Sequence, residues 1–569
     1  SGHSSRLYQE IREKRALAHS IDAWTYNPGN PGLFGISAVV DGDKFEATRS
    51  AILSQLDRVK NELVTKSELT KAIKQFTAAT LSTKKTMQGQ AQDTGGNWLA
   101  ANDLNLSERF LAAIQYLTPE DIQRVARTYL TASNRTLYAL LPTGSKVTTI
   151  ESREAIVDYP IQKFDLPNGL RVLLKEDHRL PFVEMRTVFQ GGVLSESVET
   201  NGASQLVAKT LLKGTATRSA EMIASEIETL GGSIDSYGGN NSFGINTEVL
   251  SGDFEQGLEL LADVVLNSAF PESALEREKL VQLANIRAQR DHLLQSAGRL
   301  MRRTMFGQTG YGLDVNGSEE SLGRINREEL LRFVERLMSP ANCVLAIFGD
   351  ISVARAKSLI EEKFGKWNQT KELIKYSGTP PIIQGQVKVH ESRDKKQGVI
   401  IVAFPGVTIY DQARFPLELL QEALSDLGSR LFVRIREKLG LAYYVGAQHF
   451  IGLQPGYFAL YAGTAPESIA QVRSEIFSEV ETLRREGITA EELKRAKAKL
   501  LGQKKIARQD LGSYAVATAL DELYGLGYQN CDLEDANYEQ VTQEEVHAAI
   551  VKYLRPETCV VSTAGPTAA

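Results

Sequence analysis

Cysteine and histidine are scarce in this 569-residue chain, and both shortages limit its chemistry. The three cysteines, Cys343, Cys531 and Cys559, are far apart and odd in number, which argues against a disulfide framework or a zinc knuckle. The seven histidines never lie three or four positions apart. The chain therefore contains neither H-E-x-x-H nor H-x-x-E-H, the helical motifs that bind catalytic zinc, and we expect no metal site in it.

Long hydrophobic runs and an excess of one charge are missing as well. No apolar run approaches the roughly 18 residues that a membrane span needs. Lys and Arg number 65 and Asp and Glu 70, for a formal net charge of −5, which gives no sign of nucleic-acid binding. The G-x-S-x-G elbow and the P-loop are also absent. A composition that is 42% hydrophobic and 24% charged is nevertheless typical of a folded protein, and the length suggests about three or four domains.

An internal repeat is the strongest signal in the sequence. When position 5 is aligned with position 429, positions 5–34 match 429–458 without a gap and share 13 identities. We call this alignment the repeat register. The same register aligns Thr65 and Glu68 with Thr489 and Glu492. Both pairs have the spacing of a capping box at the start of a helix. Two copies of one α/β unit, each about 140 residues long, therefore lie at the two ends of the chain.

Each copy has a recognisable order of elements. In the first copy, the pattern predicts a helix at 5–14, a strand at 33–40, and a helix at 118–130 followed by a short strand at 136–141. The second copy repeats the last pair at 542–554 and 558–562. Strands mixed with long helices favour an α+β fold in which helices cover the sheet.

A third unit lies between the two copies. It opens with a turn and a strand at 164–174, continues with helices predicted at 201–213, 254–267 and 272–297, and ends with a strand at 344–348 and a helix at 352–364. Polar or Pro/Gly-containing stretches flank it. The predicted domains are residues 1–143, 161–368 and 386–569, with linkers at 144–160 and 369–385.

Several motifs together resemble the M16 metallopeptidases, the insulinase and pitrilysin family that includes the mitochondrial processing peptidase. The resemblance covers nearly the whole chain and implies tandem M16-type (LuxS/MPP-like) domains, each a mostly antiparallel sheet covered by helices, in a two-half clamshell. The motifs are Leu166-Pro167-Asn168-Gly169, Leu212-Lys213-Gly214-Thr215, Tyr311-Gly312 with Gly317-Ser318-Glu319-Glu320-Ser321, Gly349-Asp350, and Ser429-Arg430-Leu431 with Arg436 and Leu441-Ala442-Tyr443.

The residues that bind zinc in that family are replaced in this chain. The family uses H-x-x-E-H on a helix and a third ligand, a glutamate, further along the chain. The resemblance aligns Ser204, Val207 and Ala208 with His, Glu and His, and places Asn285 near the third ligand. Valine cannot accept a proton and alanine cannot coordinate a metal. We therefore expect zinc only in a further M16 domain preceding Ser1, and a complete catalytic set nowhere in this chain.

One pair of functional residues is retained. The resemblance implies that Arg436 and Tyr443 contact the scissile peptide and stabilise the oxyanion that forms during hydrolysis. The alternative is that Arg436 pairs with an acid on its own helix and Tyr443 packs on the core. In the first copy Arg12 matches Arg436, but His19 stands in place of Tyr443, as expected if only the second copy faces a catalytic site.

Two functions are compatible with these observations. In the first, the chain is the C-terminal portion of an M16 zinc peptidase that acts on unfolded or extended peptides, with the zinc in the preceding domain. In the second, it is a non-catalytic partner or scaffold that assists a catalytic M16 subunit. In either case we expect no peptidase activity from the chain alone, no membrane span and no nucleic-acid partner. The compartment stays open, and an exported, periplasmic location would fit a bacterial source.

Overall fold

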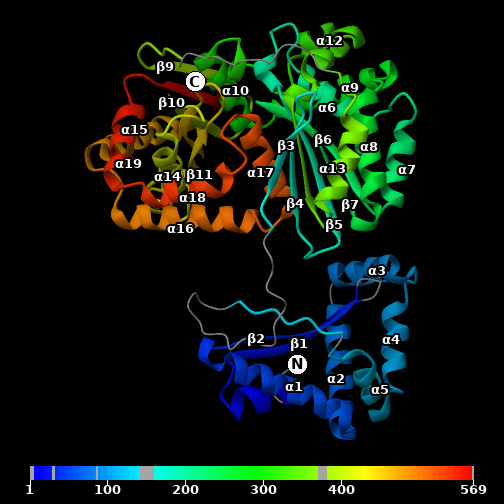
Figure 1. Ribbon diagram of the computed structural model, residues 1–569. Helices are drawn as coiled ribbons and strands as arrows, with labels where there is room; N and C mark the ends of the chain where they lie inside the picture. The colour runs from blue at the N-terminus through cyan, green and yellow to red at the C-terminus, as the bar shows by residue number, and fades with distance from the viewer. Residues whose placement is uncertain are drawn as a thin grey trace. The chain divides into compact units, whose positions relative to one another are not determined.

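The structure of the chain is a computed structural model, in which contacts divide the protein into two compact units (Figure 1). Unit 1 comprises residues 1–155 and unit 2 residues 156–569. Most of the two predicted linkers, 144–158 and 369–380, lies outside the described residues. The described residues are 5–27, 32–84, 87–132, 134–140, 159–368 and 381–566.

Unit 1 contains a small sheet and a set of helices. Strands β1 (Ser20–Tyr26) and β2 (Leu33–Val39) pair antiparallel along their whole length. They follow a π-helix, η1 (Tyr8–Glu13), whose Ile11 is fully buried against Ala51 and its neighbours. The helices are α1 (Phe45–Asn61), α2 (Lys66–Thr83), α3 (Met87–Ala101), α4 (Leu106–Ile114) and α5 (Pro119–Tyr129).

The first half of unit 2 contains a six-stranded sheet of order β3-β4-β8-β5-β7-β6, in which only β4 and β8 run parallel. Helices α6, α8 and α13 pack on one face of this sheet. The strands are β3 (Gln162–Asp165), β4 (Arg171–Glu176), β5 (Phe182–Gln190), β6 (Ser233–Gly238), β7 (Ser242–Leu250) and β8 (Cys343–Gly349). The helices are α6 (Ala203–Leu211), α7 (Ala220–Thr229), α8 (Phe254–Asn267), α9 (Glu272–Gln289), α10 (Leu293–Phe306), α11 (Glu319–Arg324), α12 (Arg327–Leu337) and α13 (Val353–Phe364).

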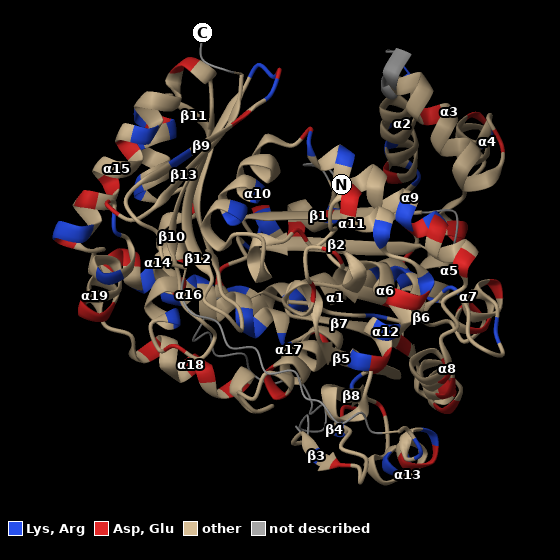
Figure 2. Ribbon diagram, turned by 90° about the horizontal axis from the view of Figure 1, so that it is seen from above, with Lys and Arg blue, Asp and Glu red and all other residues tan. Residues whose placement is uncertain are grey.

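The second half of unit 2 contains a five-stranded sheet of order β11-β12-β10-β13-β9, in which only β13 and β9 run parallel. A π-helix, η7 (Phe432–Lys438), leads into β11. The strands are β9 (Val387–Ser392), β10 (Gly398–Pro405), β11 (Ala442–Phe450), β12 (Tyr457–Thr464) and β13 (Val560–Gly565). The helices are α14 (Arg414–Leu424), α15 (Ile469–Glu486), α16 (Ala490–Ala507), α17 (Leu511–Leu523), α18 (Asn530–Gln540) and α19 (Gln543–Tyr553). Lys and Arg alternate with Asp and Glu along outer helices such as α15 (Figure 2).

Each sheet of unit 2 is covered on its second face by a helix from the other half. Helix α17 follows the five-stranded half in sequence but packs on β5 and β8 of the six-stranded sheet. In exchange, α10 packs on β10, β13 and β9 of the five-stranded sheet. Burial on both faces explains why every residue of β8 is apolar or glycine and buried. This exchange of helices joins the two halves into one compact unit (Figure 1).

The structure confirms the internal repeat. In the repeat register, the first residues of α1 to α5 align with the first residues of α15 to α19, which are Phe45, Lys66, Met87, Leu106 and Pro119 against Ile469, Ala490, Leu511, Asn530 and Gln543. Both predicted capping boxes form, since Thr65 and Thr489 accept a hydrogen bond from the backbone N–H of Glu68 and Glu492. These glutamates also bind equivalent arginines, Arg6 at 2.7 Å and Arg430 at 2.5 Å.

Two expected elements differ from the prediction. The strand predicted at 136–141 does not form in its described part, 136–140, whereas its counterpart becomes β13. Strand β13 is held between β10 and β9, and no third strand pairs with β1 or β2 in the described part of unit 1. The helix predicted at 272–297 is divided into α9 and α10, because the backbone is extended at His292.

Candidate functional site

Helix α6 carries the residues that the family resemblance aligns with the zinc motif. The carboxylate of Glu196 holds the first turn of this helix. The buried carboxylate of Glu196 accepts hydrogen bonds of 2.8 Å from the backbone N–H groups of Gly202 and Ser204 and from the Asn201 side chain. A negative charge at a helix N-terminus satisfies N–H groups that have no partner within the helix. Burial raises the pKa of Glu196 despite these donors. Gly202, with φ +93°, allows the turn that precedes the helix.

The motif positions themselves are closed off from solvent. Ser204, Val207 and Ala208 are each at most 1% exposed, and Val207 belongs to the main core of the six-stranded half. The carbonyl of Ala208 accepts a hydrogen bond of 2.6 Å from the Ser236 hydroxyl on β6. Within the described ranges, no three His, Cys, Asp or Glu side chains are grouped so that they could hold a metal ion. These residues therefore do not fit a catalytic zinc ion.

Asn285, the residue predicted near the third ligand, has an exposed side chain on α9. Gln282, one turn earlier on α9, bonds to the residue at the start of α6, a contact that sequence reasoning missed. Its amide donates to the carbonyls of Gly202, at 3.3 Å, and Asn316, at 2.7 Å. Gln282 thus connects the start of α6 to the loop before α11, a structural role that no motif in the sequence indicates.

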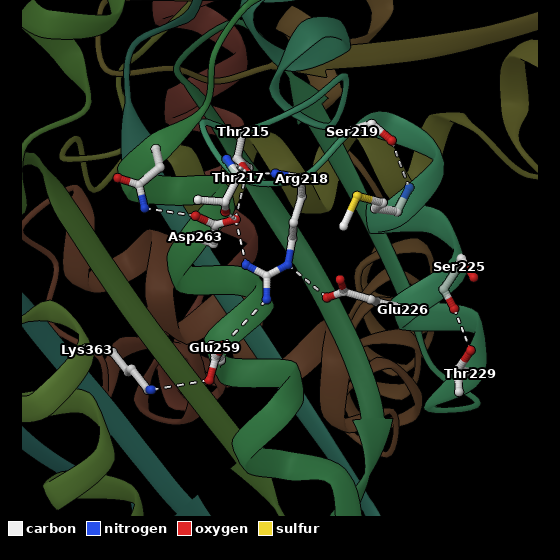
Figure 3. A network of polar contacts seen from close by, with 12 residues as sticks. Thr215, Thr217, Arg218, Ser219, Ser225, Glu226, Thr229, Glu259, Asp263 and Lys363 are labelled. Atoms are coloured by element: carbon white, nitrogen blue, oxygen red, sulfur yellow. Dashed lines mark hydrogen bonds and ion pairs between the residues drawn. The ribbon is translucent and has the colours of Figure 1, made fainter.

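A polar network holds the segment that follows α6 (Figure 3). The Arg218 guanidinium donates to Glu226 and Asp263 at 2.8 Å each and lies 3.5 Å from Glu259. Asp263 also accepts a hydrogen bond of 2.7 Å from Thr215, part of the Leu212–Thr215 motif. Burial raises the pKa of Asp263, but the hydrogen bonds from Asn267, Thr215 and Arg218 outweigh it, so the pKa is lowered overall. Thr215 of the Leu212–Thr215 motif therefore helps to hold the loop between α6 and α7 in place.

Replacing Arg218 with Met is expected to destabilise unit 2 by about 3 kcal/mol, because it leaves the buried carboxylate of Asp263 without its cation. Since the pKa of Asp263 is lowered in the folded state, the carboxylate stabilises the fold at neutral pH and this contribution is lost as the pH falls below the ordinary carboxyl range. Urea unfolding at pH 7 and pH 3 measures both effects. Arg355→Met, which removes an exposed pair with Glu255, is the control and should cost less than about 1 kcal/mol; equal losses in the two variants would contradict the account.

Arg436 and Tyr443 lie at the junction of η7 and β11, and both side chains are exposed. Arg436 stacks 4.8 Å above the ring of Phe432 and has no acidic partner within ion-pair distance among the described residues. Tyr443 is 55% exposed and lies at a β-bulge, where the register of β11 against β12 shifts between Ala442 and Tyr444. A bulge commonly directs a side chain out of the regular sheet. The pair can therefore reach a molecule bound outside the sheet.

The equivalent place in the first copy is built differently. Arg12 stacks on Tyr8 at 4.6 Å, as Arg436 does on Phe432. His19, at the position of Tyr443, is instead engaged by Asp41, with Nε2 2.8 Å from the carboxylate. Arg12, His19 and Asp41 line a hollow of about 370 Å³. Among the described residues, Arg12 also pairs with Glu13 at 3.4 Å, whereas Arg436 has no acidic partner and Tyr443 is exposed.

Two family models match the chain. The model for insulinase, peptidase family M16, matches residues 171–318, and the model for the peptidase M16 inactive domain matches residues 1–76 and 324–500. The chain belongs to peptidase family M16. Ser204, Val207 and Ala208, the residues that the resemblance aligns with the zinc motif, fall inside the first of these matches.

M16 relatives include proteins named for zinc-dependent proteolysis. An uncharacterized zinc protease of Mycobacterium leprae is 30% identical over 67% of this chain and 87% of its own length. The uncharacterized zinc protease YmxG of Bacillus subtilis is 26% identical over 64% of this chain and 88% of its length.

Solved structures show the same fold. The peptidase M16 inactive domain from Pseudomonas fluorescens has a TM-score of 0.66 and 24% identity and covers 72% of this chain and 98% of its own. A protease from Helicobacter pylori has a TM-score of 0.67 at 15% identity, over 72% of this chain and 100% of its own. The predicted fold class, α+β domains with mostly antiparallel sheets, is confirmed. No helix among the described residues is both long and apolar enough to cross a membrane.

Proposed function

We propose that this M16 chain forms part of the wall of a peptide-binding chamber and supplies transition-state contacts to a zinc site carried by another M16 domain. One observation carries the proposal. The positions that would hold zinc on α6 are buried and have no ligands, whereas Arg436 and Tyr443 are exposed and available. The chain would then be the C-terminal portion of a peptidase, and Arg436 and Tyr443 would act only when the zinc-bearing domain is in place.

The physical role of the pair follows from the chemistry of peptide hydrolysis. When a peptide carbonyl is attacked, its oxygen gains negative charge, and hydrogen-bond donors directed at that oxygen stabilise the transition state. Arg436 offers a permanent positive charge with several N–H donors, and Tyr443 offers an O–H donor. Charge-assisted hydrogen bonds of this kind are stronger than neutral ones. The substrates would be unfolded or extended peptides, whose backbone can pair with the edge of a sheet.

A second function remains open, in which the chain is a non-catalytic partner or scaffold of an active M16 subunit. The apolar replacements Val207 and Ala208 on α6 favour it, because they are packed in the core of a domain that folds without zinc ligands. The two functions differ in where the zinc motif is encoded.

Sequencing the complete reading frame around residues 1–569 separates the two. The first function predicts H-x-x-E-H in the same frame, in a domain encoded upstream of Ser1. A frame without it, combined with a separate gene product that carries H-x-x-E-H and co-purifies with this chain, would support the scaffold. If neither polypeptide carries the motif, both functions are wrong.

A further inference from the structure

A cleft in unit 2 lies between α9, α10 and the end of β9, and its walls are rich in arginine. The cavity has a volume of about 580 Å³, which is within the usual range for a site that binds a small ligand. Arg290 at the end of α9, Arg299 and Arg303 on α10, and Arg393 just after β9 all line it. We call this cavity the arginine cleft.

Positive charge is in excess around the arginine cleft. Seven arginines surround four carboxylates, because two of the carboxylates face two arginines each and Arg303 has no acidic partner among the described residues. The pairs are Arg287 and Arg290 with Glu319, Arg299 and Arg393 with Glu391, Arg302 with Asp314, and Arg324 with Glu320. An excess of this sign in a cleft favours an anionic ligand.

Some N–H groups of these arginines have no acceptor. The side chain of Arg303 makes neither an ion pair nor a hydrogen bond with any described residue, and the residue is exposed. Arg299 lies 3.6 Å from Glu391, which is too long for a hydrogen bond. The Nε atom of Arg393 is buried and has no hydrogen-bond partner among the described residues. Buried donors normally have a partner, so a ligand with acceptor oxygens would complete this site.

The other walls of the arginine cleft suit a peptide better than a bare inorganic anion. Ile286, Leu300 and Leu313 give it an apolar part. Gln308 also lines it and is exposed, and its side-chain amide can bond a peptide backbone. Arginine binds a carboxylate through two parallel N–H···O bonds. A peptide with a carboxylate therefore matches all three kinds of wall, whereas a phosphate ion has nothing to place against the apolar side chains.

We propose that the arginine cleft binds the carboxylate of an extended peptide, which is either an acidic side chain or the C-terminal carboxylate. Arg303 and Arg393 donate charge-assisted hydrogen bonds to it. The inference rests on the proposed function in that the ligand is a peptide, but it needs no zinc, and neither Arg436 nor Tyr443 lines the cleft. It adds a preference for acidic peptides that the chemistry of hydrolysis does not require.

Fluorescence anisotropy of labelled peptides with the 569-residue chain tests this binding. The reference peptide is short and unfolded, contains a single Glu and ends in a free carboxylate. Its variants have Gln in place of Glu, an amidated C-terminus, or both. We expect the reference peptide to bind about tenfold more tightly than the doubly neutral one, and the two single changes show which carboxylate is bound. Equal binding of the charged and neutral peptides would overturn the proposal, as would displacement by inorganic phosphate as effective as displacement by unlabelled reference peptide.

Arg303→Met tests whether the arginine cleft is the site. Arg303 is exposed and has no ion pair with a described residue, so the variant should keep its thermal unfolding temperature. It should bind the reference peptide about tenfold more weakly and the doubly neutral peptide equally well. Arg332→Met is the matched control, because it removes an exposed arginine of α12 that does not line the cleft, and it should change neither affinity.

Two results would contradict the site. One is a loss of affinity in Arg332→Met as large as the loss in Arg303→Met. The other is a loss in Arg436→Met with none in Arg303→Met, which would show that the carboxylate is bound by the residues of the proposed function and not by the arginine cleft. The two proposals can therefore fail separately.

Discussion

Replacing Tyr443 with Phe, or Arg436 with Met, is expected to lower kcat about 100- to 1,000-fold in the complete M16 assembly, with KM nearly unchanged. Each substitution removes donors that the transition state needs more than the bound peptide does, and a loss of one such donor has an effect of this size. Both side chains are exposed and neither supports the core, so the fold should not change. Steady-state hydrolysis of a fluorogenic peptide measures kcat and KM, and circular dichroism checks folding.

The internal repeat supplies matched controls for this experiment. Arg12→Met and His19→Phe change the corresponding positions of the first copy, where His19 is held by Asp41. Both variants should keep the activity of the unmodified assembly. The proposed role of Arg436 and Tyr443 would be wrong if their variants kept full activity, or if the first-copy variants lost as much.

Replacing Val207 with Glu, as the zinc motif would require, is expected to destabilise unit 2 by about 3 to 5 kcal/mol at neutral pH. Val207 is fully buried in the core, and a carboxylate there would have neither a cation nor a metal to compensate its desolvation. Burial would raise the pKa of the introduced carboxyl. The destabilisation is therefore greatest above that raised pKa and lessens as the pH falls and the group binds a proton.

Urea unfolding at pH 8 and pH 5 measures both the loss and its pH dependence. Asn285→Glu is the matched control, because the same charge is introduced at an exposed position of α9, where it should cost within about 0.5 kcal/mol. If Val207→Glu were as stable as Asn285→Glu at pH 8, position 207 would have to reach solvent or a cation, contrary to its place in the core.

Features that depend on local sequence were predictable. The repeat, the capping boxes at Thr65 and Thr489, and the turn at Asn168-Gly169 all follow from residues close together in the chain or from a direct comparison of its two ends. The strand predicted at 136–141 does not form in its described part, 136–140, and local sequence could not show this. A strand forms only when neighbouring strands bond to it, and the matching β13 has two such neighbours, β10 and β9. The exchange of α10 and α17 between sheets could not be predicted either, since an amphipathic pattern shows that a face is buried but not which sheet covers it.

The candidate site was predictable in its residue types but not in its geometry. The absence of zinc ligands at Ser204, Val207 and Ala208 can be read directly from the aligned motif. The bulge that exposes Tyr443 has no sequence signature, because it arises from a register shift against β12. Gln282 was missed for a similar reason. A glutamine that bonds two backbone carbonyls looks like any surface glutamine until the fold brings α9 to α6.

Zinc analysis of purified residues 1–569 tests the central claim most directly. The chain is dialysed against metal-free buffer after incubation with excess zinc, and its bound metal is measured by mass spectrometry alongside hydrolysis of an unfolded peptide. The account predicts far less than one zinc per chain and no hydrolysis that a chelator can inhibit. One tightly held zinc per chain, with chelator-sensitive cleavage, would contradict it.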